Sequence, residues 1–476
     1  MQKSLYNCKD NEIKKLITEK KINITVVGVG TIGLAEAIFF SSKGFEVTGL
    51  DVSDERVKQI NETRCVCEYP ELLKDVVKKG NLKATTNPSD ALKNADFILV
   101  CVPTPVDQNK KIKFEYAFKA AENIGKNMKN GCIIVFESSV SPGSTIKFKE
   151  KIESFSKFRA GKDFGLAYVP ERYNPALPTE MHEKIIHEKN ISKNKTSVDV
   201  PKYTLDKINR VVGAIDNKSL FATKLLYEQM LNATIYPVSS IETAEAVKLT
   251  ENIFRDVNIA LVNELSKIYS KLKLDTFEII EAAKTKQFAF LPHYPGVGVG
   301  GECIPVDTWY LIEEAEKINC ETKIMKTSRE VNDSMPLFTA TVLEKALEKA
   351  KLKIRGSTIG VLGLSYKANI ADIRVSPSFD LIKILQDRGA EVKVCDPVVE
   401  KAGIKTIKLY NIEETIANSD ALILATDHDI FLTIKPEYLK KNMRKTIVID
   451  GRNFFDFKKF EKLGFIIMGI GKPMGE

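Results

Sequence analysis

Residues 22–33 read I-N-I-T-V-V-G-V-G-T-I-G, and this stretch decides the fold. Its β-branched run predicts a buried strand, and its three glycines follow at the spacing G-x-G-x-x-G. The apolar residues 34–43 then predict a helix, and residues 45–50 predict a second strand that ends at Asp51. Strand, glycine turn, helix, strand and acidic residue together make a complete dinucleotide-binding unit.

Each glycine of this unit has a physical task. Gly28 makes the tight turn, Gly30 lets the backbone approach a pyrophosphate at a helix N-terminus, and Gly33 lets helix and strand pack closely. Asp51 is placed for ribose hydroxyls and favours NAD over NADP, because it would repel a 2′-phosphate. We expect three neighbouring residues to contact the cofactor as well: Thr31, Ile32 and Arg56.

The sheet continues beyond this unit. Strands are expected at 95–102, 132–136 and 164–169, with helices between them, for example at 114–128. This alternation predicts a parallel, doubly wound sheet, in which ligands lie at the carboxyl ends of the strands. The polar residues after two of these strands are therefore candidate cofactor contacts: Thr104, Ser138 and Ser139.

Residues 239–273 contain neither proline nor glycine, and their apolar positions recur every three or four residues. This pattern predicts one long helix, whose apolar stripe must be covered by a second domain or by another copy of the chain.

The last third of the chain repeats the pattern of the first. I-G-V-L-G-L-S at 359–365 resembles the first strand and turn, but Ser365 and Ala368 stand where Gly30 and Gly33 stand. We therefore expect a second α/β domain with a different ligand role. The predicted fold is α/β, with two Rossmann-like doubly wound domains joined by the long helix and a helical middle domain. The expected domains are 1–212, 213–333 and 334–476.

The 476 residues have ordinary globular composition, with 43% hydrophobic and 28% charged residues and a net charge of +8. The mild charge and the absence of a basic tract with interleaved aromatics argue against nucleic acid as a partner. No apolar stretch approaches the ~18 residues of a membrane span. The first twenty residues carry Asp10, Glu12 and Glu19 and no apolar h-region, so they do not resemble a signal peptide. We expect a cytoplasmic protein with reduced thiols.

No metal site is predicted. The eight cysteines include no C-x-x-C pair, so a structural zinc site is not expected. Residues 179–206 are rich in charged and polar side chains and predict a solvated loop. The loop includes His182 and His187, five residues apart, for which a metal site is the minor alternative.

Two groups of residues carry the chemistry. In Y-P-G-V-G-V-G-G-E-C-I-P-V-D-T-W-Y-L at 294–311, four glycines precede Cys303 at the start of a predicted helix, where the helix dipole favours a thiolate. Asp307 follows one turn later. Lys248 and Asn252 are four apart on the long helix and share a face, so they are able to stabilise an oxyanion. A surface lysine beside an ordinary helix asparagine is the alternative interpretation.

With these residues, the chain resembles the UDP-glucose/GDP-mannose dehydrogenase family over nearly its whole length. The motif G-x-G-x-G-G-x-C-x-P-x-D falls at 296–307. The resemblance implies four-electron oxidation of the C6 alcohol of a UDP-sugar to a carboxylate, with NAD as cofactor. It also implies that Cys303 is the nucleophile, through a thiohemiacetal and then a thioester.

The resemblance implies further roles. Lys248 and Asn252 match the pair that stabilises the oxyanion, Asp307 the acid that orders water, and Glu171 the base for hydrolysis. Ser139 stands where many members have a threonine that binds this water, and Arg374 matches a motif at the substrate and cofactor cleft, where we assign it to the cofactor. The expected substrate-binding residues are Arg172, Lys248, Asn252, Arg255, Tyr294, Gly298 and Lys367.

The sequences around 252–265 and 304–307 resemble those of UDP-N-acetylhexosamine dehydrogenases. UDP-N-acetylmannosamine is therefore the first expected substrate, with UDP-N-acetylglucosamine and UDP-glucose as alternatives. Val297, Glu302 and Thr308 replace a proline, a histidine and a proline that are usual in the family. A glutamate beside the nucleophile adds negative charge, which raises the pKa of a thiol. A homodimer or a higher homo-oligomer is expected.

Two other classes of protein share parts of this pattern. A non-catalytic nucleotide-sugar-binding homologue would show the loss of Cys303, Lys248 or Asp307, and none of them is lost. A two-electron 3-hydroxyacid dehydrogenase shares the N-terminal unit and a lysine on a long helix, but needs neither the cysteine nor a second α/β domain.

Overall fold

The computed structural model describes residues 4–65, 67–107, 111–173, 204–399 and 407–473. Contacts group them into two units. The first contains the described residues up to 173 together with 204–251 and 309–319, and the second contains 252–308 and the described residues from 320 onward. The division into three domains stays a prediction. No helix among the described residues is long and apolar enough to cross a membrane.

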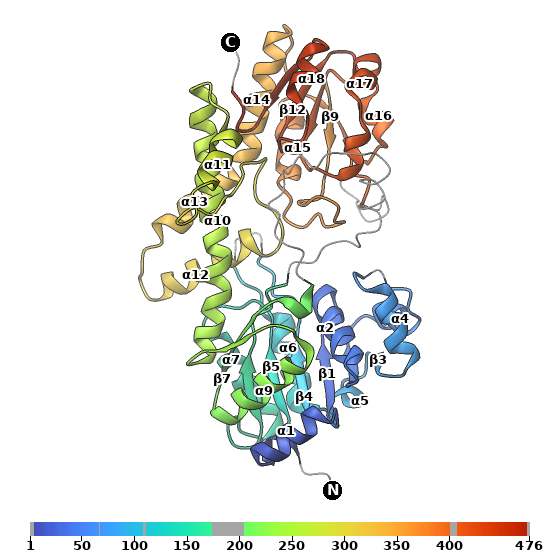
Figure 1. The fold of residues 1–476 in the computed structure, drawn as a ribbon, viewed down its shortest axis with the longest axis vertical. Helices are drawn as coiled ribbons and strands as arrows, with labels where there is room; N and C mark the ends of the chain where they lie inside the picture. Colours follow the sequence, from blue (N-terminus) through green and yellow to red (C-terminus); the bar gives the residue numbers. More distant parts are fainter. Residues whose placement is uncertain (1–3, 66, 108–110, 174–203, 400–406, 474–476) are drawn as a thin grey trace. The chain divides into compact units, whose positions relative to one another are not determined.

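The first unit is built on one eight-stranded sheet (Figure 1). Its strand order is β3-β2-β1-β4-β5-β6-β7-β8, and every neighbouring pair is parallel except β6 and β7. The strands are β1 (Asn23–Val27), β2 (Glu46–Leu50), β3 (Leu82–Thr85), β4 (Phe97–Val100), β5 (Ile133–Phe136), β6 (Gly165–Tyr168), β7 (Arg210–Ala214) and β8 (Ile235–Pro237).

Helices cover both faces of this sheet, because buried strands carry apolar side chains on both sides. One apolar cluster packs the sheet against α1, α2, α4 and α9, and a second packs it against α5, α6 and α7. The helices of this unit are α1 (Asp10–Thr18), α2 (Thr31–Ser42), α3 (Asp54–Asn61), α4 (Pro70–Lys78), α5 (Pro88–Leu92), α6 (Glu115–Asn127), α7 (Ser144–Ser156) and α9 (Asn217–Met230). The predicted doubly wound unit is confirmed.

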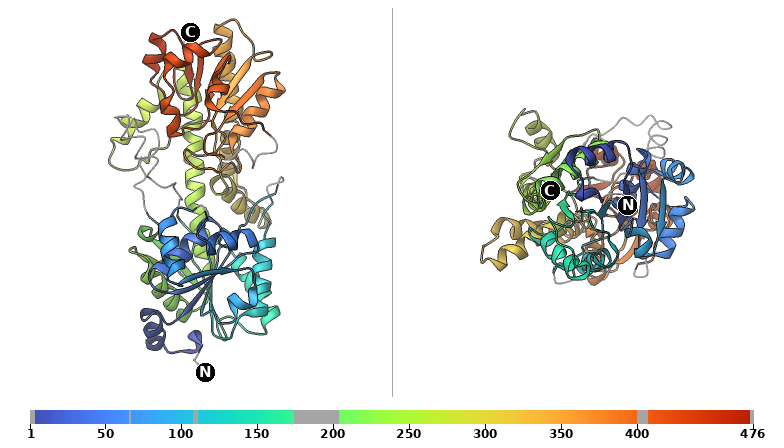
Figure 2. Two further views of the ribbon diagram at one scale, coloured as in Figure 1. Left: turned by 90° about the vertical axis from the view of Figure 1, so that its right-hand side faces the viewer. Right: turned by 90° about the horizontal axis from the view of Figure 1, so that it is seen from below.

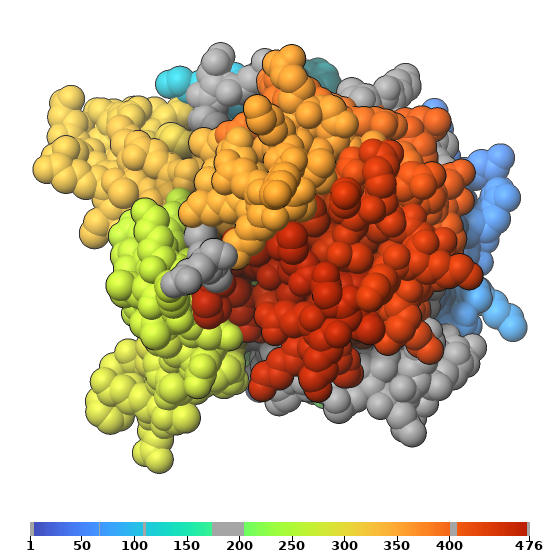
Figure 3. Space-filling model, turned by 90° about the horizontal axis from the view of Figure 1, so that it is seen from above, coloured from blue at the N-terminus to red at the C-terminus, as the bar shows by residue number. Residues whose placement is uncertain are grey.

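The second unit contains a five-stranded parallel sheet in the order β10-β9-β11-β12-β13. Its strands are β9 (Thr358–Leu362), β10 (Glu391–Cys395), β11 (Ala421–Leu424), β12 (Ile447–Asp450) and β13 (Ile466–Gly469). α14 (Met335–Lys349) and α15 (Pro377–Asp387) cover one face, and α16 (Ile412–Ile416), α17 (Pro436–Asn442) and α18 (Phe457–Lys462) cover the other. Figure 3 shows α14, in orange, beside the red C-terminal segment that it packs against.

The predicted long helix is confirmed as α10 (Ile241–Lys271), 31 residues in length (Figure 2). Its residues up to Glu251 belong to the first unit and the rest to the second. The second unit also contains α11 (Thr276–Lys284) and α13 (Lys323–Asp333), while α12 (Ile304–Lys317) begins in the second unit and ends in the first.

The predicted solvated loop lies outside the described residues up to residue 203, and so do His182 and His187. Its last residues are described and differ from the prediction. Leu205 is fully buried in the apolar cluster beneath α2 and α9, within the 3-10 turn Leu205–Lys207. In the sequence, a single leucine among polar residues is only a weak indication that the chain packs into the core again at this point.

Candidate active site

The glycine turn after β1 has the geometry that a bound pyrophosphate needs. A Cβ on Gly33 would lie 2.0 Å from the Gly28 carbonyl oxygen, so only glycine permits this packing of α2 on β1. Gly28 has φ +88°, in the left-handed region. A Cβ on Gly30 would meet nothing within 4 Å, and Gly30 is the N-cap of α2. Open space at a helix N-terminus fits the phosphates of NAD.

Asp51 and Arg56 support this turn. The two carboxylate oxygens of Asp51 accept the backbone N–H groups of Val29, at 3.0 Å, and of Ser53, at 3.1 Å. Arg56 Nε donates to the Val29 carbonyl at 2.9 Å, and its Nη2 donates to the Gly30 carbonyl at 3.3 Å. Both side chains therefore fix the loop that would face the cofactor.

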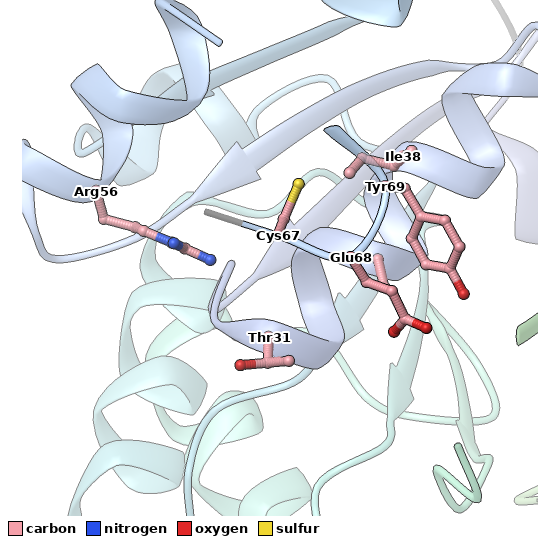
Figure 4. A pocket seen from close by; sticks show the side chains of 7 residues that line it. Thr31, Ile38, Arg56, Cys67, Glu68 and Tyr69 are labelled. Carbon is pink, nitrogen blue, oxygen red and sulfur yellow. The ribbon is translucent and has the colours of Figure 1, made fainter. Parts of the chain in front are cut away.

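A pocket opens beside the first turn of α2 (Figure 4). Its lining includes three residues that sequence reasoning missed, because they belong to an irregular loop with no motif: Cys67, Glu68 and Tyr69. The others are Thr31, Ala35, Ile38 and Arg56. Burial raises the pKa of the Cys67 thiol, and the same holds for Cys65, whose sulfur lies 2.6 Å from Arg56 Nη1. Neither thiol is thus activated.

The loops after β4 and β5 are tied together by hydroxyl groups. Thr104 Oγ1 donates to the backbone oxygen of Ser139 at 2.6 Å, and Ser138 Oγ donates to that of Val102 at 2.6 Å. The hydroxyl protons of Thr104 and Ser138 are used within the chain, so towards a ligand these two oxygens act as acceptors.

Glu171 and Lys248 lie together in the first unit. Lys248, 8% exposed on α10, donates through Nζ to the backbone oxygen of Glu171. Burial raises the pKa of the Glu171 carboxyl, and the nearby Lys248 and Arg210 act against this shift. A raised pKa improves a carboxylate as a general base. Arg172 is held by Glu251 on α10, at 3.1 Å from its Nε.

Cys303 and Asp307 stand at the start of α12, as the sequence predicts. Cys303 is exposed and directly precedes the helix, and its carbonyl accepts the backbone N–H of Asp307 at 2.8 Å. Asp307 is 1% exposed, and its Oδ2 accepts Asn252 Nδ2 at 2.6 Å. The second unit therefore brings Cys303, Asp307 and Asn252 together, with the thiol at a helix N-terminus that favours its thiolate.

The glycine loop before Cys303 packs against the segment that follows β9. A Cβ on Gly300 would lie 2.5 Å from Cβ of Tyr366 and 2.8 Å from the Val375 carbonyl oxygen. The Gly301 N–H donates to the Arg374 carbonyl at 3.1 Å. Lys367 belongs to the same segment. This close approach explains the glycines as packing requirements.

The family departure Glu302 has a partner in this segment. Arg374 pairs with Glu302 and also binds Asp372, at 2.9 Å from Nε and 2.6 Å from Nη2. One guanidinium therefore lies between the glutamate beside the nucleophile and a second carboxylate, and it offsets one of these two negative charges. Arg255 lies nearby: partial burial lowers its pKa, and Cys303 and Tyr366 act against this shift.

The other two residues that differ from the family motif, Val297 and Thr308, are accommodated by packing and hydrogen bonding. Val297 is fully buried in the apolar core of the second unit. Thr308 Oγ1 donates to Asp256 at 2.9 Å, which a proline would not do.

The remaining expected substrate residues lie in two places. Gly298 has φ +145° and packs on Pro377, where a Cβ would lie 2.8 Å from the proline ring. Tyr294 instead turns towards α11, where its ring stacks on Phe277 and its hydroxyl donates to Glu281. Among the described residues, no group of three or more His, Cys, Asp or Glu side chains is arranged to hold a metal ion.

Sequence reasoning also missed a buried polar cluster around Arg210, which includes Glu36 and Glu137. The sequence gives a weak indication that these three residues are buried, because each is a charged residue within or beside an apolar strand or helix.

Comparison with known proteins covers most of the chain. Residues 22–200, 242–334 and 360–457 match the NAD binding, central and UDP binding domains of the UDP-glucose/GDP-mannose dehydrogenase family. The UDP-N-acetyl-D-mannosamine dehydrogenase of Pyrococcus horikoshii is 33% identical over 95% of this chain and 99% of its own. A solved structure of UDP-D-ManNAc dehydrogenase from Pyrococcus horikoshii superposes with a TM-score of 0.82 at 32% identity, over 95% and 99% of the two chains. A UDP-N-acetyl-D-glucosamine 6-dehydrogenase of Pseudomonas aeruginosa is 32% identical over 89% of this chain and 94% of its own.

Proposed function

The chain belongs to the UDP-glucose/GDP-mannose dehydrogenase family, and from this membership we propose that it oxidises UDP-N-acetylmannosamine to UDP-N-acetylmannosaminuronate. The chain is an NAD-dependent UDP-sugar dehydrogenase. The observation that best supports this chemistry is the exposed Cys303 thiol at the N-terminus of α12. It lies one turn from the buried Asp307 carboxylate, which binds Asn252.

The proposed reaction removes two hydrides from one carbon. NAD⁺, when bound, accepts a hydride from C6 in each oxidation. The Cys303 thiolate adds to the C6 aldehyde and forms a thiohemiacetal, so that the second hydride leaves a tetrahedral carbon and a thioester remains. Water then attacks the thioester, the C–S bond breaks, and the carboxylate and the thiol are released. In balance, one alcohol, one water and two NAD⁺ give one carboxylate, two NADH and three protons.

The other residues handle charge and protons in this proposal. Lys248 and Asn252 stabilise the developing oxyanion, because an ammonium and an amide N–H are its natural partners. Glu171 accepts a proton from the attacking water, for which its raised pKa suits it. Asp307 and Ser139 orient that water.

The sugar is proposed from the relatives. The Pyrococcus horikoshii enzyme that matches nearly the full length is a UDP-N-acetyl-D-mannosamine dehydrogenase. UDP-N-acetylglucosamine is the second candidate, because the Pseudomonas aeruginosa relative with almost the same identity carries that name.

We also propose that the chain forms a homodimer through α10. Phe254, Leu261 and Ile268 follow at intervals of seven residues, and each is about half exposed, with 48%, 54% and 45% of its surface accessible. An apolar stripe of this kind on a helix favours a helical partner, and a second copy supplies one.

A panel of UDP-sugars with NAD⁺ tests the proposal, with NADH absorbance and mass analysis of the product. We expect two NADH for each UDP-N-acetylmannosamine and a uronate product. Cys303→Ser is expected to abolish uronate formation, whereas Cys320→Ser, at another exposed cysteine, retains it. One NADH per sugar with no acid, or activity that survives Cys303→Ser, would contradict the mechanism.

A further inference from the structure

A buried polar cluster lies in the first unit at the edge where β4, β5 and β6 end. Arg210 and Glu36 are fully buried, and Glu137 is 2% exposed. Arg210 Nη2 donates to Glu36 Oε1 at 2.6 Å, and Arg210 Nη1 lies 3.5 Å from Glu171 Oε1. One guanidinium therefore stands between a carboxyl group of α2 and the candidate base.

The antiparallel strand β7 creates this arrangement. Its register pairs Ala167 with Ala214 and Tyr168 with Gly213. Continued in the same direction, this register places Arg210, the first residue of β7, opposite Glu171. The contact is thus a product of the fold rather than of a mobile side chain.

The charges of the cluster do not balance if every group is ionised. Glu36, Glu137 and Glu171 supply three negative charges, whereas Arg210 and Lys248 supply two positive ones. Arg172, the other cation near Glu171, is bound to Glu251. An uncompensated charge is costly in a buried site, so one carboxyl group retains a proton.

The hydrogen bonds indicate which carboxyl group is neutral. Glu137 accepts the hydroxyl of Tyr227 on one oxygen, and the thiol of Cys101, at 3.6 Å, on the other. Glu36 Oε2 is buried and has no hydrogen-bond partner among the described residues. A bare carboxylate oxygen without a donor is the least favourable state for such a site. In agreement, burial and the nearby Glu137 raise the pKa of Glu36 well above its usual value, and burial raises that of Glu137 to about 7.

We propose that Arg210 is a positioning residue for Glu171, and that Glu36 stays protonated so that the charge of Arg210 remains available to Glu171. This inference rests on the proposed function, in which Glu171 takes a proton from the water that hydrolyses the thioester. Arg210 holds the carboxylate in place and keeps it ionised, while Lys248 approaches it from α10. Glu36 holds the other side of the guanidinium without neutralising it.

The pH dependence of uronate release, measured by rapid quench, tests both the role of Arg210 and the protonated state of Glu36. Arg210→Met removes the cation, so the acid limb of the profile is expected to move up by about one pH unit or more. Arg210→Lys restores a charge and returns the midpoint towards the wild-type value, which a purely structural role would not predict. An active Arg210→Met variant with an unmoved midpoint would overturn the role of Arg210. If circular dichroism shows that Arg210→Met does not fold, Arg210→Gln takes its place, because a glutamine keeps N–H donors without the charge and is expected to give the same upward shift.

Glu36→Gln tests whether the Glu36 carboxyl group carries a proton. A neutral amide replaces a neutral acid, so the midpoint is expected to stay in place. If Glu36 were ionised, the substitution would remove a negative charge and move the midpoint down, which would overturn this half. Glu245→Gln is the matched control, because Glu245 is a buried glutamate outside the cluster that accepts the backbone N–H groups of Gly143 and Thr145.

An infrared measurement on the whole protein separates this inference from the proposed function. At about pH 8.5, we expect the C=O stretch of a protonated carboxyl group, lost in Glu36→Gln and kept in Glu245→Gln. Glu245 does not contribute there, because burial raises its pKa only to about 7. Absence of the band in the wild type would overturn the protonated Glu36. If no UDP-sugar is oxidised, the proposed function fails while the band still reports on Glu36.

Discussion

Asn252 Nδ2 lies 2.6 Å from Oδ2 of Asp307, and both side chains are almost fully buried. The contact joins α10 to the first turn of α12, whose backbone in turn binds the carbonyl of Cys303 at 2.8 Å. A single hydrogen bond thus fixes the position of the carboxylate relative to the helix start that carries the thiol. An amide is suited to this task, because its second N–H stays available for an oxyanion.

Asn252→Ala is therefore expected to lower kcat by about 100-fold, because it removes both the oxyanion donor and the anchor of Asp307. The KM for NAD⁺ is expected to change little. Asn258→Ala is the matched control, since Asn258 lies on the same helix and its amide donates to the Phe254 carbonyl. Equal kcat losses in the two variants would argue against a specific role for Asn252. Steady-state NADH absorbance with the preferred UDP-sugar measures both.

The glycines of the first turn are expected to respond differently to alanine. Gly33→Ala places a Cβ 2.0 Å from a backbone oxygen, so we expect a loss of about 1–3 kcal/mol in the free energy of unfolding. Gly30→Ala meets no atom within 4 Å, so stability is retained, whereas NAD⁺ affinity falls by about tenfold or more if a pyrophosphate fills that space. Urea unfolding and NAD⁺ titration by calorimetry distinguish the two. Unchanged NAD⁺ affinity in Gly30→Ala would place the pyrophosphate elsewhere.

Arg374→Ala is expected to raise the pKa of the Cys303 thiol by about 0.5–1 unit, because it leaves Glu302 without its partner beside the nucleophile. The double variant Arg374→Ala with Glu302→Gln should return the value to that of the wild type. The rate of alkylation by iodoacetamide as a function of pH reports the titration, with Cys320→Ser as the background to silence the other exposed thiol. A shift that persists in the double variant would mean that Arg374 acts on the thiol directly.

Acid stability is expected to depend on Asp396. Its carboxylate accepts the hydroxyl of Ser365 at 2.6 Å and lies 3.2 Å from His428 Nε2. Although burial opposes ionisation, the bonds from His428 and Ser365 prevail and lower the pKa of Asp396 to about 2. Because the unfolded value is higher, the stabilisation is complete above about pH 4 and is lost as the pH falls towards 2.

Asp396→Asn should therefore cost about 2 kcal/mol in the free energy of unfolding at neutral pH and almost nothing near pH 2. Urea unfolding at several pH values measures the difference between the two proteins. Parallel stability curves for wild type and variant would contradict the lowered pKa.

Much of the fold could be predicted from patterns of neighbouring residues in the sequence. The spacing of Gly28, Gly30 and Gly33 defines a turn that few other folds use, and the absence of proline and glycine from 239–273 leaves one long helix as the simplest outcome. Cys303 was placed correctly at a helix start because a glycine run ends there and an apolar period begins. In each case the signal lies within a few neighbouring residues.

Contacts between distant residues were not predictable in this way. Arg210 meets Glu36 only because β7 runs against β6, and no local pattern fixes the direction of a strand. The pairing of Glu302 with Arg374 likewise depends on how two loops pack. From the sequence alone, Glu302 was expected to raise the pKa of the Cys303 thiol, whereas the arginine that pairs with Glu302 lies 72 residues away.

The reversed direction of β7 also bears on how this fold tolerates change. β6 ends and β7 begins at the same edge of the sheet, and residues 169–209 connect them. Insertions and deletions there leave strand order and register intact, since each doubling of a loop costs only about 0.6 kcal/mol of closure entropy. Changes of length are therefore expected to be tolerated between residues 174 and 203, whereas Glu171, in the candidate site, and Leu205, in the core, have to keep their places.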